Sequence, residues 1–294
     1  MFKEATLYSP VIRTENGHVS VLFAEEHPGR HDEAYQRHRA RIAKLALDHV
    51  PGQPVPDVRY TDEEHELWRL VGAELREKHQ RYACREFLDG VRRLDLPTDR
   101  LPQLGEASAR LTELTGFRFR PAAGIVEMRD FYGSLADGLF QATQYIRHCS
   151  MPRFSPEPDM IHEVVGHGSA LANDRLAGIY LRVGEAARRA ENRESLAALS
   201  RVFWFALEYG LVREDGEIRA CGASLLSSVG ELEQFREAAD IRPLDAAEMS
   251  ALTYRVEDYQ PVLFCADSFD DLEAFLDGFL DEVRCGAPTG AARG

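Results

Sequence analysis

The sequence lacks the features of a secreted, disulfide-linked or membrane-spanning protein. Its five cysteines are an odd number, lie far apart and form no Cys-x-x-Cys pair, which argues against a disulfide framework. No apolar run approaches the length of a membrane span, and the N-terminus has no apolar signal core. Together these absences predict a cytoplasmic protein from a reducing compartment.

Basic residues are also outnumbered by acidic ones. The chain has 35 Lys and Arg against 49 Asp and Glu, which gives a net charge of -14. A nucleic-acid-binding face needs the opposite balance, because it must neutralise phosphates. We therefore expect no nucleic acid or membrane among the partners, and a small polar or zwitterionic substrate fits the charge better.

Internal repeats and linkers are absent as well, so we predict one mainly α (α+β) catalytic domain over residues 1–294, with its core at about 20–284. Thr61 and Glu64 form a predicted capping box at the start of a helix, and its buried stripe is expected to include Leu67, Leu70 and Val71. Further predicted segments are helices at 134–148, 159–167, 174–191 and 193–212, a strand at 124–128, a hairpin at Asp215-Gly216 and a disordered tail at 286–294.

What the chain does contain is a concentration of metal-ligand side chains at residues 156–167. His162 and His167 lie five residues apart with Glu163 between them, whereas the zinc-protease pattern His-Glu-x-x-His needs a spacing of four. On an ideal helix, steps of about 100° place the two imidazoles roughly 140° apart. They can meet at one metal if the helix is bent or widened, and Gly166 would ease that. A zinc hydrolase with Glu163 as general base stays an alternative.

The third ligand must come from elsewhere in the chain. No histidine follows His167, so a downstream ligand has to be a carboxylate or a cysteine. Glu208 is the only charge in the apolar stretch 203–211, and a buried carboxylate requires a cation as partner. Two imidazoles and one carboxylate form the facial triad of non-haem Fe(II) oxygenases. His162, His167 and Glu208 are thus predicted as metal ligands and catalytic groups for oxygen activation.

At these residues the sequence resembles the pterin-dependent aromatic amino acid hydroxylases, most closely the phenylalanine hydroxylases. The resemblance covers roughly residues 20–280 in ordered blocks at 26–29, 52–56, 101–104, 115–121, 129–131, 143–148, 203–211, 222–228 and 259–261. It implies the same three iron ligands, a tetrahydropterin (tetrahydrobiopterin or a bacterial relative) as electron donor, and O2 as co-substrate.

The resemblance also implies the contacts of the pterin and of the amino acid. Phe131 would stack on the pterin, Glu163 would contact it through hydrogen bonds, and the backbone at Val126 and Met128 would meet its edge. Six residues are implied in amino acid binding: Arg147 and Ser155 for the carboxylate, and Pro158, Trp204, Tyr209 and Ser227 as pocket lining. Asp159 would support His162.

The sequence departs from the family pattern at positions that bear on substrate choice. Gly168 and Ser169 replace Val-Pro after the second histidine, Ser224 stands at a common glycine, and Tyr209 stands at a typical phenylalanine. The first expectation is L-phenylalanine converted to tyrosine, and Trp204 favours phenylalanine over tryptophan. Meta hydroxylation, or tryptophan or tyrosine as substrate, remains an alternative, as does a non-catalytic amino acid or pterin-binding protein. Since the chain has no room for the family's N-terminal regulatory domain and C-terminal tetramerisation helix, we expect a monomer or weak dimer.

Overall fold

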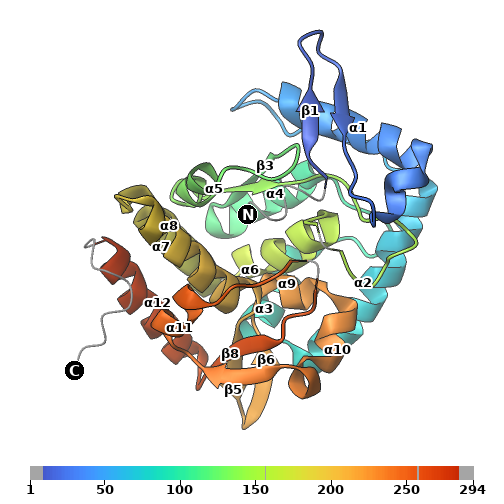
Figure 1. Cartoon of the computed structure of the whole chain (residues 1–294). Coiled ribbons are helices and arrows are strands. Elements are labelled where there is room, and N and C mark those ends of the chain that lie inside the picture. Colours follow the sequence, from blue (N-terminus) through green and yellow to red (C-terminus); the bar gives the residue numbers. More distant parts are fainter. Residues whose placement is uncertain (1–8, 156, 257, 285–294) are drawn as a thin grey trace.

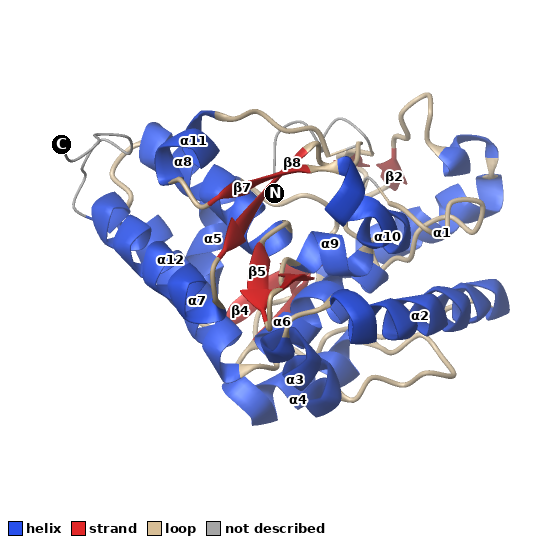
Figure 2. Ribbon diagram, turned by 90° about the horizontal axis from the view of Figure 1, so that it is seen from below, coloured by secondary structure: helices blue, strands red, loops and turns tan. Residues whose placement is uncertain are grey.

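The computed structural model describes residues 9–155, 157–256 and 258–284, so the predicted disordered tail lies outside the described residues. The predicted mainly helical class is confirmed, since helices enclose small sheets (Figures 1 and 2). The helices are α1 (Glu33–Asp48), α2 (Asp62–Tyr82), α3 (Arg85–Leu94), α4 (Leu104–Thr115), α5 (Met128–Leu135), α6 (Ser169–Leu171), α7 (Asp174–Arg189), α8 (Arg193–Phe203), α9 (Ala223–Ser227), α10 (Val229–Ala238), α11 (Ala246–Ala251) and α12 (Phe269–Arg284). Two segments, η3 (Ile161–Gly168) and η4 (Trp204–Glu208), are π-helices, and η2 (Pro28–His31) is a short 3-10 helix.

The strands form three small sheets among the described residues. An antiparallel hairpin joins β1 (Val11–Arg13) and β2 (Val19–Val21), and it projects at the top of Figure 1. A parallel pair joins β3 (Arg118–Pro121) and β4 (Leu139–Ala142). The largest sheet has the order β6-β5-β8-β7, with β5 (Leu211–Glu214), β6 (Glu217–Ala220), β7 (Asp240–Pro243) and β8 (Val262–Ala266). The predicted hairpin at Asp215 and Gly216 is confirmed, and both residues have positive φ as a tight turn requires.

Local sequence signals account for the start and the buried face of α2. Thr61 Oγ1 accepts a hydrogen bond from the Glu64 amide at 3.2 Å, while Glu64 Oε2 accepts one from the Thr61 amide at 2.7 Å, so the predicted capping box is confirmed. Leu67 and Val71 are buried as expected, but Leu70 is 50% exposed. Leu70 lies at the edge of the apolar stripe, where a leucine is not forced into the core.

Two predicted segments between 124 and 148 are wrong. Residues 124–127 form a loop rather than a strand, since the pairing of β3 with β4 ends at Pro121 and Ala142, and only the Ala122 amide, which donates to the Ala142 carbonyl at 2.8 Å, extends it. The helix predicted at 134–148 is replaced by the end of α5 and by β4. Gly138 breaks the helix with a φ of 62°, and Leu139–Ala142 then satisfy their backbone groups by pairing with β3.

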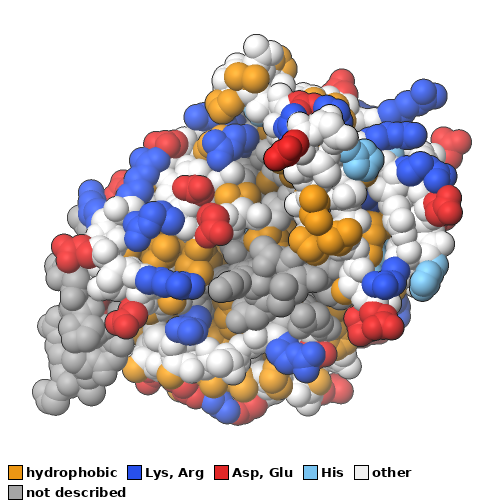
Figure 3. Space-filling view, turned by 45° about the horizontal axis from the view of Figure 1, so that its top comes forward, with side chains coloured by type: hydrophobic (Ala, Val, Ile, Leu, Met, Phe, Trp, Pro, Cys, Tyr) orange, Lys and Arg blue, Asp and Glu red, His pale blue; other side chains and the backbone are white. Residues whose placement is uncertain are grey.

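The hydrophobic core is continuous across the described residues, and charged side chains of both signs share the surface. One cluster of buried apolar side chains extends from Ile42 in α1 to Val283 in α12. Acidic and basic side chains intermingle over the face in Figure 3. Within the described part of the chain, none of the helices combines the length and the apolarity that a bilayer crossing needs.

Candidate active site

The two histidines meet because the helix that carries them is widened. η3 follows a π-helical path, in which the hydrogen bond joins residues five apart, so His162 and His167 share one face. Their Nε2 atoms lie 3.0 Å apart, close to the separation of two donors at right angles on one metal with bonds of about 2.1 Å. The predicted widening is therefore present. A Cβ on Gly166 would lie 2.6 Å from the Ala223 carbonyl oxygen, so glycine lets α9 pack against the widened turn.

Glu208 lies beside the two histidines, at the end of a second π-helix. The Tyr209 amide donates to the Trp204 carbonyl at 2.9 Å, which closes η4 and places Glu208 at its end. Glu208 Oε1 lies 3.2 Å from His167 Nε2, and Glu208 Oε2 lies 4.0 Å from His162 Nε2. Two nitrogens and one carboxylate thus converge on a small volume, as the sequence predicted for a facial triad.

Glu163 also has a carboxylate oxygen within 4.8 Å of ligand nitrogens of both histidines, so two acids compete for the third position. Burial raises the pKa of Glu163 to about 8, and the charge of Glu208 adds to the shift. Burial acts to raise the pKa of Glu208 as well, but His167, His162 and a hydrogen bond outweigh it and lower that pKa to about 2. Glu208 is consequently the ionised acid, and ionised carboxylate is the form that binds a metal.

The imidazoles are held in the state that a metal needs. Burial, reinforced by His167, lowers the pKa of His162 to about 4, which keeps this ring neutral. Ser227 Oγ donates to the Ser224 carbonyl at 3.0 Å and therefore accepts from His162 Nδ1 at 3.3 Å. The Tyr180 hydroxyl oxygen lies 3.0 Å from His167 Nδ1 and can likewise accept a hydrogen bond from the Nδ1–H group. Both arrangements leave the Nε2 lone pairs for the metal.

The Glu208 carboxylate is likewise oriented by a hydroxyl. Ser224 Oγ donates to Glu208 Oε2 at 2.7 Å, which holds one oxygen away from His167 and leaves Oε1 facing it. From the sequence, Ser224 was noted only as a departure from the family, and Tyr180 was missed altogether. Tyr180 sits in an ordinary amphipathic helix, so its spacing carries no signal. Its role depends on α7 crossing the π-helix.

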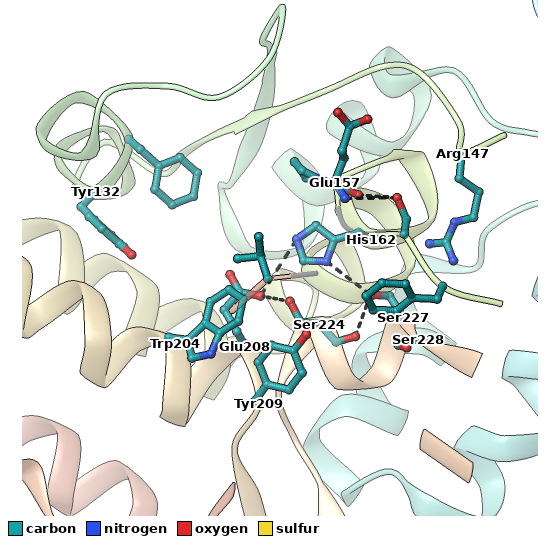
Figure 4. Close-up of a pocket in the computed structure, with 15 residues that line it drawn as sticks. Tyr132, Arg147, Glu157, His162, Trp204, Glu208, Tyr209, Ser224, Ser227 and Ser228 are labelled. Carbon is teal, nitrogen blue, oxygen red and sulfur yellow. Dashed lines mark hydrogen bonds and ion pairs between the residues drawn. The ribbon is translucent and has the colours of Figure 1, made fainter. Parts of the chain in front are cut away.

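A pocket opens beside the candidate metal ligands and gathers all six predicted substrate residues (Figure 4). In Figure 4, Trp204 and Arg147 lie on opposite sides of His162. Val126, Met128 and Glu163 do not line this pocket. The lining residues are Phe131, Tyr132, Arg147, Phe154, Ser155, Glu157, Pro158, His162, Trp204, Glu208, Tyr209, Ser224, Ser227, Ser228 and Val256.

Arg147 is fixed in place by a buried ion pair. Its Nε and Nη2 donate to the two oxygens of Asp159, each at 2.8 Å, and its Nη1 donates to the Pro152 carbonyl at 3.2 Å. Among the described residues this occupies three of the five guanidinium N–H groups and leaves two for a ligand. Asp159 Oδ1 also accepts from the His162 amide at 3.2 Å, so the expected support of His162 runs through its backbone.

The opposite wall of the pocket is aromatic and rigid. The Trp204 ring stacks on Tyr254 at 4.2 Å between centroids and 12° between planes, and Trp204 Nε1 donates to Gln260 Oε1 at 3.2 Å. The Tyr209 ring also contacts this indole, tilted by 41° at 4.8 Å between centroids. Ser155 lines the pocket, but its hydroxyl donates to the Glu157 carbonyl at 2.7 Å. The pocket therefore has a cationic end and an aromatic end, which suits a free aromatic amino acid.

Comparison with known proteins agrees with this chemistry. The family model of biopterin-dependent aromatic amino acid hydroxylases matches residues 17–285. A phenylalanine 3-hydroxylase of Streptomyces coeruleorubidus is 45% identical over 85% of this chain and 89% of its own length. A mouse tyrosine 3-monooxygenase is 40% identical over 88% of this chain, which spans 53% of that relative.

Solved structures give the same answer for the fold. A phenylalanine hydroxylase of Chromobacterium violaceum, with bound iron(III) and 7,8-dihydrobiopterin, superposes with a TM-score of 0.74 at 27% identity. The match covers 86% of this chain and 94% of that one. The apo enzyme of Colwellia psychrerythraea superposes with a TM-score of 0.71 at 26% identity, covering 81% of this chain and 93% of that one.

Proposed function

Because this chain belongs to the biopterin-dependent aromatic amino acid hydroxylases, we propose that it hydroxylates the ring of free L-phenylalanine at iron held by His162, His167 and Glu208. The observation that carries the proposal is the convergence of these three side chains beneath a pocket with Arg147 at one side and Trp204 at the other. A donor set of two neutral imidazoles and one carboxylate suits Fe(II) and leaves positions open for other ligands.

In this proposal the protein mainly orients the amino acid and excludes water. Bound iron and tetrahydropterin would together activate O2, the pterin would supply two electrons, and O2 would supply the oxygen atom that enters the ring. The two remaining N–H groups of Arg147 take the substrate carboxylate, with Ser155 beside them. Pro158, Trp204 and Tyr209 hold the aromatic ring over His162, and Ser227 keeps that imidazole in its metal-binding tautomer.

The buried carboxylate of Glu163 fits its proposed role in binding the pterin. Glu163 Oε2 is buried and has no hydrogen-bond partner among the described residues, while Oε1 accepts from the Thr143 amide at 3.0 Å. A buried polar atom of this kind calls for a ligand. Phe131 would stack on the ring, and the loop backbone at Val126 and Met128 would meet its edge.

For the position on the ring, we propose meta hydroxylation. The support is that two relatives of high identity, the phenylalanine 3-hydroxylase and the tyrosine 3-monooxygenases, are both named for position 3. Para hydroxylation to tyrosine is the second candidate, and a pine phenylalanine 4-monooxygenase, 36% identical over 90% of this chain, favours it. We further propose that residues 17–285 form one catalytic domain and that it acts in the cytoplasm.

Product analysis tests the proposal directly. Enzyme, Fe(II), tetrahydropterin and O2 would be incubated with phenylalanine, tyrosine or tryptophan, and the ortho, meta and para products separated by chromatography. The proposal expects meta-tyrosine from phenylalanine, in amounts that depend on the pterin. Para-tyrosine as main product would overturn the ring position alone. Absence of any pterin-dependent product from all three amino acids would overturn the function.

A further inference from the structure

A second group of ligand-type side chains lies outside the active site. The Cys84 sulfur and one carboxylate oxygen each of Glu86 and Glu214 all lie within 4.8 Å of one another. Cys84 is fully buried and the two acids are half-buried. None of the three lines the substrate pocket. They meet where the start of α3 approaches β5 and β6, in the lower half of Figure 1.

The backbone holds these three side chains in fixed positions. Ala83 and Ala220 form an isolated parallel β-bridge, and the Cys84 amide donates to the Ala220 carbonyl at 2.9 Å. This anchors Cys84 as the N-cap residue of α3. Glu214 Oε1 accepts from the Arg85 amide at 3.0 Å, which ties the end of β5 to the same helix start. The cluster is therefore organised by main-chain contacts rather than by flexible side chains alone.

One oxygen of the cluster has no protein donor. Glu86 Oε1 accepts from Arg175 Nη1 at 3.2 Å, whereas Glu86 Oε2 is buried without a hydrogen-bond partner among the described residues. Burial raises the pKa of Glu86, and the nearby charge of Glu214 adds to the shift. Glu86 Oε2 and the Cys84 thiol, beside the second carboxylate of Glu214, thus form a group of donors that can take up a cation.

A second thiol stands beside the first. Cys221 follows Ala220 as Cys84 follows Ala83, so the parallel bridge sets the two cysteines side by side in register. Burial raises the pKa of the Cys221 thiol, and Cys84, Cys265, Glu86 and Glu214 each raise it further. Cys221 thus lies next to Cys84 but outside the three-residue cluster.

We propose that Cys84, Glu86 and Glu214 form a second metal site, with Zn²⁺ as the preferred ion and Cys221 or water in the fourth position. Zinc accepts thiolate and carboxylate ligands together in tetrahedral geometry, whereas the histidine-rich triad suits iron. Binding forms the zinc–sulfur bond as the Cys84 thiol releases its proton to solvent.

Occupancy of this site would brace the segment that supports Glu208. The amides of Cys221 and Gly222 both donate to the Gly210 carbonyl, at 2.9 and 3.1 Å. A Cβ on Gly222 would lie 2.3 Å from the Glu208 carbonyl oxygen, so this turn packs directly on the backbone of the ligand. Zinc would then link α3 to that turn and raise the melting temperature.

Cobalt(II) titration of the metal-free full chain tests the proposal, because Co²⁺ replaces zinc and iron and reports its ligands. We expect two equivalents to bind, one of which gives a sulfur-to-cobalt charge-transfer band in the near ultraviolet. Cys84→Ser should lose that band and that equivalent while the other equivalent remains. His162→Ala should show the reverse, and Cys149→Ser, which changes an exposed thiol elsewhere, should behave as the parent protein.

Each contrary outcome is decisive. No thiolate band in the parent protein, or a band that persists in Cys84→Ser, overturns the proposal. If Cys84→Ser fails to fold, the Glu214→Gln variant tests the metal site instead. This variant can still accept the Arg85 amide, yet it should weaken the sulfur-ligated cobalt by at least tenfold, and unchanged affinity overturns the site. All of these readouts are independent of hydroxylation, so failure here leaves the proposed function intact.

Discussion

At the scale of single residues, the three proposed metal ligands depend on hydroxyl groups that face them. Ser227 and Tyr180 set the tautomers of His162 and His167, and Ser224 orients Glu208. The ligands themselves could be predicted from the sequence, because histidines and an isolated acid in an apolar run are rare and chemically distinctive. Their supporting hydroxyls could not, because Tyr180 and the histidine it contacts lie on different helices and nothing in their spacing links them.

Tyr180→Phe tests the support of His167. The buried Nδ1–H would lose its acceptor, so the ring would be free to turn or to change tautomer. Loss of such a supporting contact typically weakens metal binding by roughly 10- to 100-fold. Titration with Co²⁺ measures the effect. Tyr60→Phe is the matched control, since it removes a buried hydroxyl that donates to the Gln144 carbonyl and contacts no metal ligand. Equal affinities in the two variants would contradict the assigned role.

Ser224→Ala tests the hydroxyl on Glu208. The hydrogen bond from Ser224 helps to lower the Glu208 pKa, so its removal should raise that pKa. Protons would then compete with the metal at higher pH, and the midpoint of acid-induced Co²⁺ release should move upward. Ser228→Ala, a neighbouring change in the pocket lining whose hydroxyl has no partner among the described residues, should leave the midpoint in place. An unmoved midpoint in Ser224→Ala argues against the role.

At the scale of elements, the active site is built from two π-helices that the sequence signalled unequally. The five-residue spacing of His162 and His167 requires a wide turn, and Gly166 indicated where it could form. Neither a ligand spacing nor a glycine of this kind indicated the second π-helix, which carries Glu208. The error at 134–148 has another origin. There, pairing of β4 with β3 overrides the helical preference of the local residues, and a single sequence does not display its partners.

Gly166→Ala tests the packing of η3 against α9. The added methyl would lie 2.6 Å from the Ala223 carbonyl, so one of the two elements must shift. We expect a loss of roughly 1–3 kcal/mol in unfolding free energy, as for other overpacked sites, together with weaker Co²⁺ binding. Gly178→Ala in α7 is the control, because its methyl meets only the flexible end of Arg182. Denaturant unfolding with unchanged stability in Gly166→Ala would contradict this packing argument.

At the scale of the whole molecule, stability depends on histidines buried in the neutral state. Burial lowers the pKa of His79 to about 4, and its Nε2 lies 2.7 Å from the Leu226 carbonyl, to which it can donate. In the unfolded chain the ring takes up a proton near pH 6.5, so between about 6.5 and 4 the unfolded state binds more protons. The stabilisation is therefore complete above pH 6.5 and is lost as the pH falls through this window.

His79→Gln tests this linkage, because the glutamine amide can keep the donor while removing the titration. Each such histidine contributes a slope of up to about 1.4 kcal/mol per pH unit. The metal-free variant should show a shallower fall in unfolding free energy between pH 6.5 and 4 than the parent protein, measured by urea denaturation. His31→Gln, which changes an exposed histidine, is the matched control. Identical slopes in His79→Gln and the parent would refute the linkage.

The central claim is that His162, His167 and Glu208 hold the iron while Glu163 does not. Iron content after anaerobic reconstitution and desalting, compared between Glu208→Ala and Glu163→Gln, tests it most directly. The account predicts that Glu208→Ala loses its iron and that Glu163→Gln retains it, because Glu163 is the buried acid with the raised pKa. Iron retained in Glu208→Ala and lost in Glu163→Gln would contradict the account and transfer the ligand role to Glu163.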